Sequence, residues 1–484
     1  MVEKKNLILA TVLIGVLMSA IDTTIVILAL IDINKSLNAT FLDTIWVILI
    51  YLIVLATLTT QLGRLGDIFG RGRMFNLGLA VFIIGSAASG YSPSISFLIS
   101  ARAVQGFGAV LIQGNSNAIV ADYFEPRERG RAFGITSMGW SIGATLGIVL
   151  GGIITSFIGW QYIFYINVPI GIIGLIIGLR YIKDNKKSVT GLDFPGTAML
   201  VASLSLISYG AVEFAGNGLT FTNLVFIFLG LALIIPFIFV EKYVRSPMII
   251  LGAFREKTLS FSLLTAIFQA VGYLSVLFVL ILYLQGIMGY SPLYSSLILV
   301  PGYVVSSMLA PKMGTLSDRV GARKIQSIGV FVIAAGVLIY LIISATSSIY
   351  IVVAGSIVSG FGGAMFWPSN NSAVMSAAPR ELYGSISGLL RTLSNVGTLL
   401  SYVIAISVAS ISVPRSVSFE VFLGVLKLSG GISTSFMSGI HAAFLVSFVI
   451  LVAGGVTSLV GEKQKRKVEL ESVMRPSSGE IESK

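Results

Sequence analysis

The chain has 484 residues, of which 55% are hydrophobic and only 11% are charged. Soluble domains carry roughly 25% charged residues, so this composition indicates an integral membrane protein. The absence of cysteine and the presence of a single histidine exclude disulfides, thiolate catalysis and metal sites built from Cys or His clusters. The net charge of +11 could suggest nucleic-acid binding, but the placement of the basic residues indicates membrane topology instead.

Apolar stretches long enough to cross a bilayer recur along the chain. They lie at residues 7–31, 43–62, 74–91, 95–121, 132–157, 161–182, 196–214, 221–241, 258–284, 294–312, 325–344, 348–369, 385–410 and 438–460. These fourteen stretches predict an all-α integral membrane protein. The first stretch is longer than a signal-peptide core and has no evident cleavage site, so we expect it to be a retained helix.

The basic residues define a topology for these spans. If residue 1 is cytoplasmic, only Lys35, Arg415 and Lys427 among the 32 Lys and Arg residues lie outside, and Arg102 lies within a span. The others fall at or near the cytoplasmic ends of spans, as the positive-inside rule requires. We therefore predict a multi-pass protein of the plasma membrane with both termini in the cytoplasm.

One polar phrase occurs twice, each time between two apolar stretches. The first copy runs from Gly63 to Arg73 and the second from Gly314 to Arg323. Each copy has the pattern G-x-L-[small]-D-x-x-G, followed by an arginine. A phrase that recurs at the same place in two halves predicts a duplicated membrane domain, which is typical of secondary transporters.

The spacing of the repeat predicts how the spans are grouped. Each copy lies between the second and third span of a six-span bundle if two spans form an insert between the bundles. We therefore predict an N-terminal bundle at 1–185, a two-helix insert with its flanks at 186–245 and a C-terminal bundle at 246–460. An external loop is expected at 411–437, either a small hairpin or an interfacial helix, and a disordered cytoplasmic tail at 461–484.

Several phrases resemble the major facilitator superfamily, and with fourteen spans the chain looks most like its drug:proton antiporter branch of the DHA2 type. The matching residues are Asp22 to Val26 with Ala29 and Leu30, Arg102 to Gly108, Gly159 to Gln161 with Phe164, Ile166 to Pro169 and Gly171, and Leu284 to Gly286 with Gly289 to Pro292 and Pro301. The resemblance implies fourteen helices arranged as 6+2+6 and transport by alternating access.

The fifth span carries a glycine series that resembles the antiporter motif of this family. Its members are Gly134, Gly143, Gly147, Gly151 and Gly152, and Ile148 stands where the motif has proline. Glycines at this spacing let another helix approach closely, whereas a proline would add a bend. The resemblance links the motif to exchange, so the loss of the proline leaves the transport direction open, and plain helix packing is an equal alternative.

Asp22 and Arg102 are the two charges placed most plainly inside the hydrocarbon. Asp22 lies roughly 14 Å and Arg102 roughly 11 Å from the outer ends of their spans at 1.5 Å per residue, so the two side chains can meet. Burial favours the neutral acid, whereas a nearby arginine favours the carboxylate. We expect Asp22 to be the proton-coupling acid and Arg102 its electrostatic partner; a static ion pair is the alternative.

The duplicated phrases are expected to act on conformation. The glycines allow tight turns, and the charged side chains can bridge neighbouring helix ends. By resemblance, the network would hold the cytoplasmic side closed in the outward-open state; a simple topology anchor is the alternative. Its members are Gly63, Asp67, Gly70, Arg71, Arg73, Gly314, Asp318, Arg319, Gly321 and Arg323.

Polar and aromatic residues within the spans are candidates for a substrate cavity, although each could equally serve as a hydrogen-bonding contact between helices. They are Gln61, Gln105, Gln113, Asn115, Asn117, Gln269, Tyr273, Trp367, Asn370, Asn371 and Asn395. Acids are scarce among them, which disfavours doubly charged cations as substrates. Glu213 and His441 are expected at the membrane interface rather than in the cavity.

These features favour a proton-coupled transporter that exports amphipathic or lipophilic compounds. The alternatives are an uptake or metabolite transporter on the same scaffold and a non-transporting membrane receptor or scaffold. No phosphate-binding G-x-x-x-x-G-K-[ST] loop and no acid–base or nucleophile cluster occurs, so neither an ATPase nor another enzyme is expected. We expect no cofactor, no metal and no nucleic acid, with a small molecule, protons and membrane lipids as the partners of a monomer.

Overall fold

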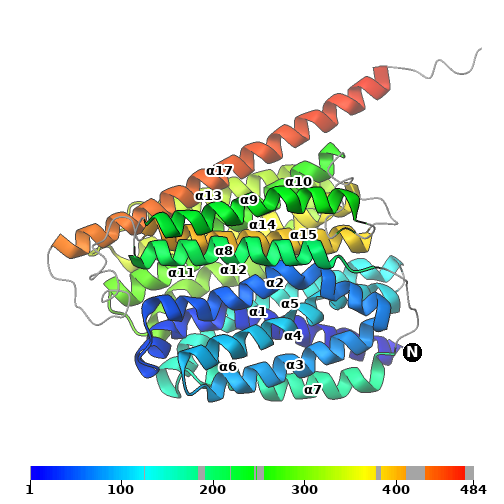
Figure 1. Cartoon of the computed structure of the whole chain (residues 1–484). Helices are drawn as coiled ribbons and strands as arrows, with labels where there is room; N and C mark the ends of the chain where they lie inside the picture. The colour runs from blue at the N-terminus through cyan, green and yellow to red at the C-terminus, as the bar shows by residue number, and fades with distance from the viewer. Residues whose placement is uncertain are drawn as a thin grey trace, which may run out of the picture.

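The computed structural model describes residues 2–124, 126–183, 191–217, 220–244, 247, 256–377, 383–409 and 431–474. Throughout these ranges the chain is built from helices and contains no strand (Figure 1). The helices are α1 (Val2–Ser36), α2 (Phe41–Phe69), α3 (Arg71–Tyr91), α4 (Ile95–Tyr123), α5 (Pro126–Phe157), α6 (Tyr162–Tyr165), α7 (Asn167–Tyr181), α8 (Phe194–Asn217), α9 (Phe221–Tyr243), α10 (Lys257–Tyr273), α11 (Val276–Ile281), the π-helical segment η2 (Leu282–Ile287), α12 (Pro292–Val320), α13 (Ala322–Tyr340), α14 (Ile349–Ala377), α15 (Tyr383–Ala409) and α17 (Gly431–Met474).

Helical structure lies at each of the fourteen predicted spans, which confirms the all-α membrane fold. Within the described ranges, thirteen helical segments are long and apolar enough to cross a membrane. The remaining predicted span, 385–410, coincides with α15, which is more polar because it carries Arg391, Asn395 and many Ser and Thr residues. A polar helix of this kind is suited to an internal position among other helices rather than to contact with lipid.

The ninth predicted span, 258–284, is interrupted rather than continuous. Its helix stops at Leu274 and Ser275, between α10 and α11, and continues into η2. The backbone N–H of Ser275 donates to Ser401 Oγ of α15 at 2.9 Å, and Ser401 Oγ donates to Ser275 Oγ at 2.8 Å. A break in a membrane helix is tolerated where a neighbouring side chain satisfies the freed backbone group, as Ser401 does here.

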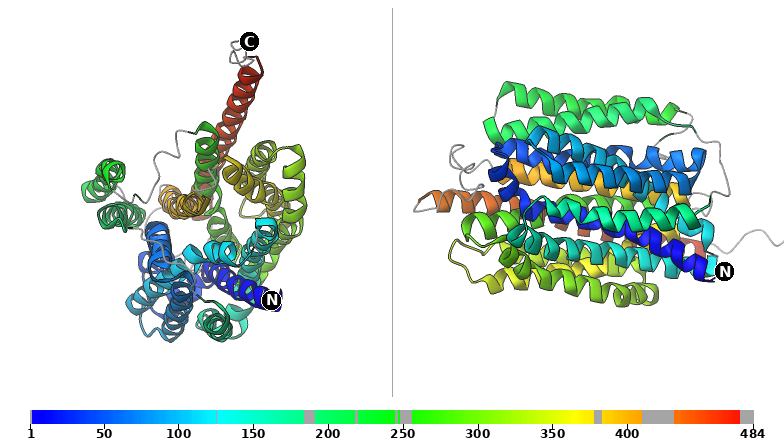
Figure 2. Two further views of the ribbon diagram at one scale, coloured as in Figure 1. Left: turned by 90° about the vertical axis from the view of Figure 1, so that its right-hand side faces the viewer. Right: turned by 90° about the horizontal axis from the view of Figure 1, so that it is seen from below.

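The helices form two groups joined by a pair. The N-terminal group is α1 to α7, the insert is α8 with α9, and the C-terminal group is α10 to α15 with α17. Helices of the two groups contact one another along two seams, α2 against α15 and α5 against α12. Seen along the helix axes, the insert stands to one side of both groups (Figure 2, left), where α8 contacts α2 and α15.

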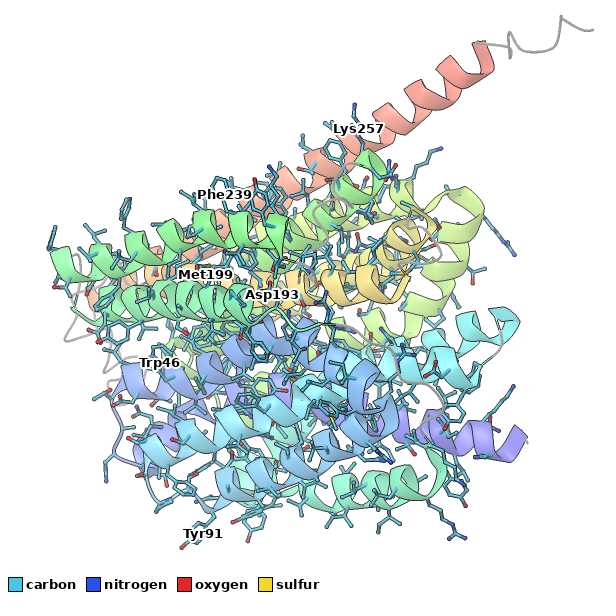
Figure 3. All side chains as sticks on the ribbon, turned by 45° about the vertical axis from the view of Figure 1, so that its right-hand side comes forward. Trp46, Tyr91, Asp193, Met199, Phe239 and Lys257 are labelled. Carbon is cyan, nitrogen blue, oxygen red and sulfur yellow. The ribbon has the colours of Figure 1, made fainter. Side chains whose placement is uncertain are left out.

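The insert is held together by close packing and faces outward on its far side. Ser203 Oγ of α8 donates to the carbonyl of Gly230 in α9 at 2.7 Å. Trp46 of α2 packs against Tyr209 of α8, with ring centroids 6.4 Å apart, and lies between the N-terminal group and the insert (Figure 3). Phe239 of α9 is exposed and points away from the molecule, as expected for a helix that meets lipid on its outer face.

The flanks of the insert are attached to α2, next to the first duplicated phrase. The backbone N–H of Asp193 donates to Gln61 Oε1 at 3.1 Å. The guanidinium of Arg64 donates to the carbonyl of Pro247 and, at 3.5 Å, to the carbonyl of Gly191. The insert is therefore connected to α2 through polar contacts at one end and through the aromatic contact of Trp46 with Tyr209.

The C-terminal part of the chain differs from the sequence-based expectation. We predicted disorder from residue 461, but α17 continues as a helix to Met474 and extends beyond the other helices (Figure 1). The reason is local, because residues 461–474 contain many Glu, Lys and other helix-forming residues and the first proline is Pro476. Of the predicted external loop 411–437, residues 411–430 lie outside the described residues, and α17 begins at Gly431.

Candidate functional site

The two predicted intramembrane charges meet inside the N-terminal group. Arg102 Nη1 of α4 lies 2.6 Å from Asp22 Oδ2 of α1, and the two side chains are 2% and 0% exposed. Arg102 Nε donates to the carbonyl of Val47 in α2 at 3.2 Å. The guanidinium also lies 4.3 Å from the ring centroid of Tyr51. The charge of the arginine is therefore compensated by a carboxylate, a carbonyl and an aromatic ring, which is what a buried charge requires.

A chain of hydrogen bonds extends this pair across the N-terminal group. Gln105 Oε1 accepts from Arg102 Nη1 at 2.6 Å, and Gln105 Nε2 donates to Asp22 Oδ1 at 2.9 Å. Gln105 Nε2 also donates to Ser86 Oγ of α3 at 3.1 Å, which accepts from Asn167 Nδ2 of α7 at 3.2 Å. A substitution in any member thus leaves a buried polar atom of another member unsatisfied.

The position of this network decides what it can do. All of its members come from α1, α2, α3, α4 and α7, and Asp22, Gln105, Ser86 and Asn167 are fully buried. Asp22 is surrounded by protein rather than by fatty tails. A buried charged side chain of this kind requires polar partners within the protein, and the network supplies them.

The two duplicated phrases adopt the same turn. Gly70 joins α2 to α3 with φ 109° and ψ 125°, and Gly321 joins α12 to α13 with φ 111° and ψ 124°. The N–H of Gly70 donates to the carbonyl of Gly66, and the N–H of Gly321 donates to the carbonyl of Ser317, both at 2.9 Å. Side chains rarely tolerate this positive φ, so glycine is required for a one-residue link between two helices.

The charged members of the phrases are placed unequally. Arg71 Nη1 lies 2.8 Å from Asp122 Oδ1, which joins the start of α3 to the end of α4, and the side chains are 33% and 41% exposed. Arg73 and Arg319 are exposed, whereas Arg323 is half-buried. The side chains of Asp67 and Asp318 lie outside the described part of the structure.

The first glycines of the two phrases also differ. A Cβ on Gly63 would meet the backbone of Gly114 in α4 at 3.3 Å, so α2 and α4 approach closely there. A Cβ on Gly314 would lie 3.5 Å from Pro368 Cβ of α14, which is an ordinary contact. Close approach at this position is therefore a property of the first copy only.

The glycine series of α5 packs against α1. A Cβ on Gly143 would lie 2.9 Å from the carbonyl of Leu17, and one on Gly147 would lie 2.6 Å from the carbonyl of Ile21. Gly151 faces Ile25 and Leu28 in the same way, whereas Gly152 faces Pro292 and Ser296 at the start of α12. The predicted close approach is thus present on α5, at one seam between the groups and inside the N-terminal group. The surroundings of Gly134 lie outside the described part of the structure.

Ile148 occupies the place of the missing proline and is fully buried. In a helix, the N–H of residue 148 donates to the carbonyl of residue 144. That carbonyl, on Ala144, also accepts from Thr24 Oγ1 of α1 at 3.1 Å. A proline at position 148 would remove the N–H donor of this helix bond. The carbonyl of Ala144 would still accept from Thr24 Oγ1 of the neighbouring helix α1.

The cavity candidates separate by their hydrogen bonds. Gln105 and Asn395 are engaged with other helices, and Gln61 accepts from the backbone N–H of Asp193, just before α8. Asn115 donates to its own helix at the carbonyl of Leu111. Both amide atoms of Gln113, Gln269 and Asn370 are buried without a hydrogen-bond partner. Asn117 and Tyr273 are half-buried, Trp367 packs on Phe366, and Asn371 is exposed. Buried amides without partners are the candidates best suited to a polar ligand.

Several polar contacts cross from one helix group to the other. Asn395 Nδ2 of α15 donates to Thr59 Oγ1 of α2 at 3.3 Å. Thr145 Oγ1 of α5 lies 3.2 Å from Ser307 Oγ of α12. Toward the other helix ends, the N–H of Leu293 donates to Ser156 Oγ at 3.2 Å. These contacts lie on the two seams, so they must break or rearrange if the groups rock against each other.

One residue on the α2/α5 side of α15 was missed by the sequence reasoning. We had grouped Arg391 with the basic residues near cytoplasmic span ends, but its guanidinium lies 5.1 Å from the ring centroid of Trp140 in α5, across the boundary between the groups. The sequence signal that could have revealed this position is the distance of Arg391 from the start of its helix. Arg391 follows Tyr383, the first residue of α15, by more than two helical turns.

Glu213 and His441, which were expected at the membrane interface, lie in α8 and α17. Glu213 is half-buried near the end of α8 in the insert. His441 Nε2 of α17 lies 2.6 Å from the carbonyl of Ile343, which follows α13.

Comparison with known proteins agrees with this architecture. The sequence profile of the Major Facilitator Superfamily matches residues 12–402. The chain is 30% identical over 400 residues to Multidrug resistance protein Stp of Mycobacterium tuberculosis (strain CDC 1551 / Oshkosh), covering 81% of this chain and 74% of that protein. It is 29% identical over 406 residues to Riboflavin transporter RibZ of Clostridioides difficile (strain 630), covering 82% of this chain and 87% of that protein.

A solved structure has the same fold. The inward-facing, unoccupied structure of a bacterial homologue of the human lysosomal transporter Spinster matches with a TM-score of 0.66 and 16% identity, over 95% of this chain and 97% of that one. The duplicated turn, the two seams and the sequence match together establish that the chain belongs to the Major Facilitator Superfamily of membrane transporters.

Proposed function

We propose that this transporter exports amphipathic or lipophilic small molecules in exchange for protons. The observation that carries the proposal is the fully buried Asp22–Arg102 pair. An acid enclosed within one moving group can hold a proton in one conformation and release it in another, since its surroundings change as the groups rock. The names of relatives such as Multidrug resistance protein Stp support export of foreign compounds.

The geometry suggests how protonation would act. A proton on Asp22 Oδ2 removes the charge that faces Arg102 Nη1. Arg102 then keeps Gln105 Oε1, the carbonyl of Val47 and the Tyr51 ring as its partners. Neutralising the acid weakens the contact between α1 and α4, and α1 also carries the face on which the α5 glycines pack. The proton would thereby change the position of the helix that contacts the seam helix α5.

The test is substrate-driven proton movement in proteoliposomes that contain an internal pH dye. Asp22→Asn should abolish proton movement driven by a drug gradient, with Asp43→Asn as the matched control, because Asp43 lies in an exposed capping box of α2. If Asp22→Asn moved protons like the unaltered protein, the coupling role would be lost. Replacing external Na⁺ with K⁺ at constant pH separates proton from sodium coupling.

The same vesicles separate the alternatives. An uptake or metabolite transporter, for which the name of Riboflavin transporter RibZ gives a precedent, would move substrate and protons in the same direction or substrate alone. Exchange in opposite directions supports export. A receptor or scaffold would bind a compound but move neither compound nor protons.

A further inference from the structure

Arg391 occupies an unusual place for an arginine. It lies eight residues after the first residue of α15, roughly 12 Å along the helix axis at 1.5 Å per residue, and its partner Trp140 belongs to the opposite helix group. A basic residue that only anchored α15 at the membrane surface would extend toward water and headgroups. Arg391 instead reaches across the boundary between the groups.

The charge of Arg391 has no counter-charge among the residues that the structure describes. Its described contact is the Trp140 ring at 5.1 Å, and no ion pair or hydrogen bond from its guanidinium joins it to a described residue. Arg102, by contrast, has a carboxylate, an amide and a carbonyl as partners. Arg391 is half-buried rather than sealed, so its N–H donors are open to a ligand.

Arg391 begins a stripe of polar side chains on one face of α15. Arg391, Asn395, Thr398 and Tyr402 follow one another at helical spacing. Two of them face the N-terminal group directly, since Arg391 stacks on Trp140 of α5 and Asn395 donates to Thr59 of α2. The face of α15 that meets the other group therefore offers hydrogen-bonding groups and one full positive charge.

Helix α5 lies across from this face of α15, and its sides contact different helices. Gly143 and Gly147 of α5 pack on α1, Thr145 meets α12, and Met138 is among the exposed residues. Trp140 is half-buried and presents its indole to the guanidinium. An indole beside a guanidinium gives a flat apolar surface next to a positive charge, which suits an aromatic ring that carries an acidic group.

We propose that Arg391 and Trp140 form a substrate-binding site in which the guanidinium pairs with a carboxylate or sulfonate and the indole stacks on the adjoining aromatic ring, so that aromatic anions are the favoured substrates. The inference rests on the proposed transport function and adds a charge class to it. An anion supplies the counter-charge that the described protein groups do not, and the N–H fork of arginine fits a planar carboxylate. Compounds with a net positive charge meet repulsion at the same place.

Binding to the full-length protein in nanodiscs tests the charge preference without any gradient. Three probes share one ring and chain but differ in charge: pyrenebutyrate, pyrenebutanol and pyrenebutyl-trimethylammonium. Energy transfer from tryptophan to pyrene reports binding, and empty nanodiscs give the background from partition into lipid. We expect pyrenebutyrate to bind more tightly than the ammonium probe.

The variants decide whether Arg391 causes that preference. Arg391→Gln should weaken pyrenebutyrate binding at least about tenfold, as expected for a lost charge-assisted contact, and leave pyrenebutanol within about twofold. Arg391→Lys should retain part of the preference. Arg180→Gln is the matched control, because Arg180 stacks on Tyr181 of its own helix and should change nothing.

Trp140→Leu provides a second route if Arg391→Gln does not fold. It keeps the charge and should weaken all three probes while preserving their order. The inference is overturned if the anion and ammonium probes bind equally, or if Arg391→Gln leaves their ratio unchanged. Loss of proton coupling in the vesicle assay would overturn the proposed function instead, since probe binding requires no proton movement.

Discussion

Gly70 and Gly321 have the same backbone conformation within a few degrees, with φ 109° and 111° and ψ 125° and 124°, although they lie in different halves of the chain. Each is the single residue between two long helices. The duplicated phrase therefore encodes one turn used twice, and both turns place the following helix antiparallel to the preceding one.

Alanine at either glycine should destabilise the protein. Because φ near 110° is strained for any residue with a Cβ, Gly70→Ala and Gly321→Ala should each cost about 1–3 kcal/mol and lower the midpoint of thermal unfolding in detergent. Gly388→Ala is the control, since a Cβ there meets nothing within 4 Å and helical alanine is favoured over glycine. Equal midpoints for all three variants would contradict the assigned role of the turn.

The Asp22–Arg102 pair should show strong coupling in a double-mutant cycle. Removing one partner of a buried pair leaves an uncompensated charge and costs about 3–5 kcal/mol, so Asp22→Asn and Arg102→Gln should each lower the stability to unfolding. The double variant should lose much less than the sum of the two. Additive losses would mean that the 2.6 Å contact does not stabilise the folded protein.

The Arg71–Asp122 pair should affect conformation more than stability. Both side chains are partly exposed, so Asp122→Asn should cost less than about 1 kcal/mol. The chain has no cysteine, which allows labelling without background. If the pair holds the predicted cytoplasmic side closed, Asp122→Asn should speed maleimide labelling of Thr145→Cys at the α5/α12 seam from that side.

A charge exchange provides the control for this latch. The combined variant Arg71→Asp with Asp122→Arg restores the pair in reverse and should return the labelling rate toward its original value. A labelling rate that is unaffected by Asp122→Asn would assign the pair to helix anchoring alone.

Ile148→Pro should be tolerated unusually well. A proline inside a helix costs about 3 kcal/mol or more, partly because the carbonyl four residues earlier loses its donor. Here that carbonyl, on Ala144, already accepts from Thr24 Oγ1, so we expect a smaller loss of thermal stability. Thr24→Val should therefore lower the thermal stability of the Ile148→Pro variant markedly more than that of the unaltered protein. Equal losses in the two backgrounds would contradict this explanation.

The sequence alone determined where the long apolar helices lie, where the duplicated turn lies and that Asp22 and Arg102 are at similar depths. Each of these depends on local composition or on distance along one helix, which the order of residues specifies directly. Thus the apolar stretches became helices, and Gly70 and Gly321 adopted one conformation because both copies contain the same turn chemistry.

Only the tertiary structure decided which side chains from different helices meet. Sequence periodicity defines the faces of a single helix but not how two helices rotate and slide against each other. Gln105 appeared to us as a cavity candidate and lies in the Asp22 network, whereas Arg391 was grouped with surface charges and faces Trp140. The pairing of α15 with α2, and the contact of Arg391 with Trp140 of α5, bring together residues more than two hundred positions apart, and no local rule contains that information.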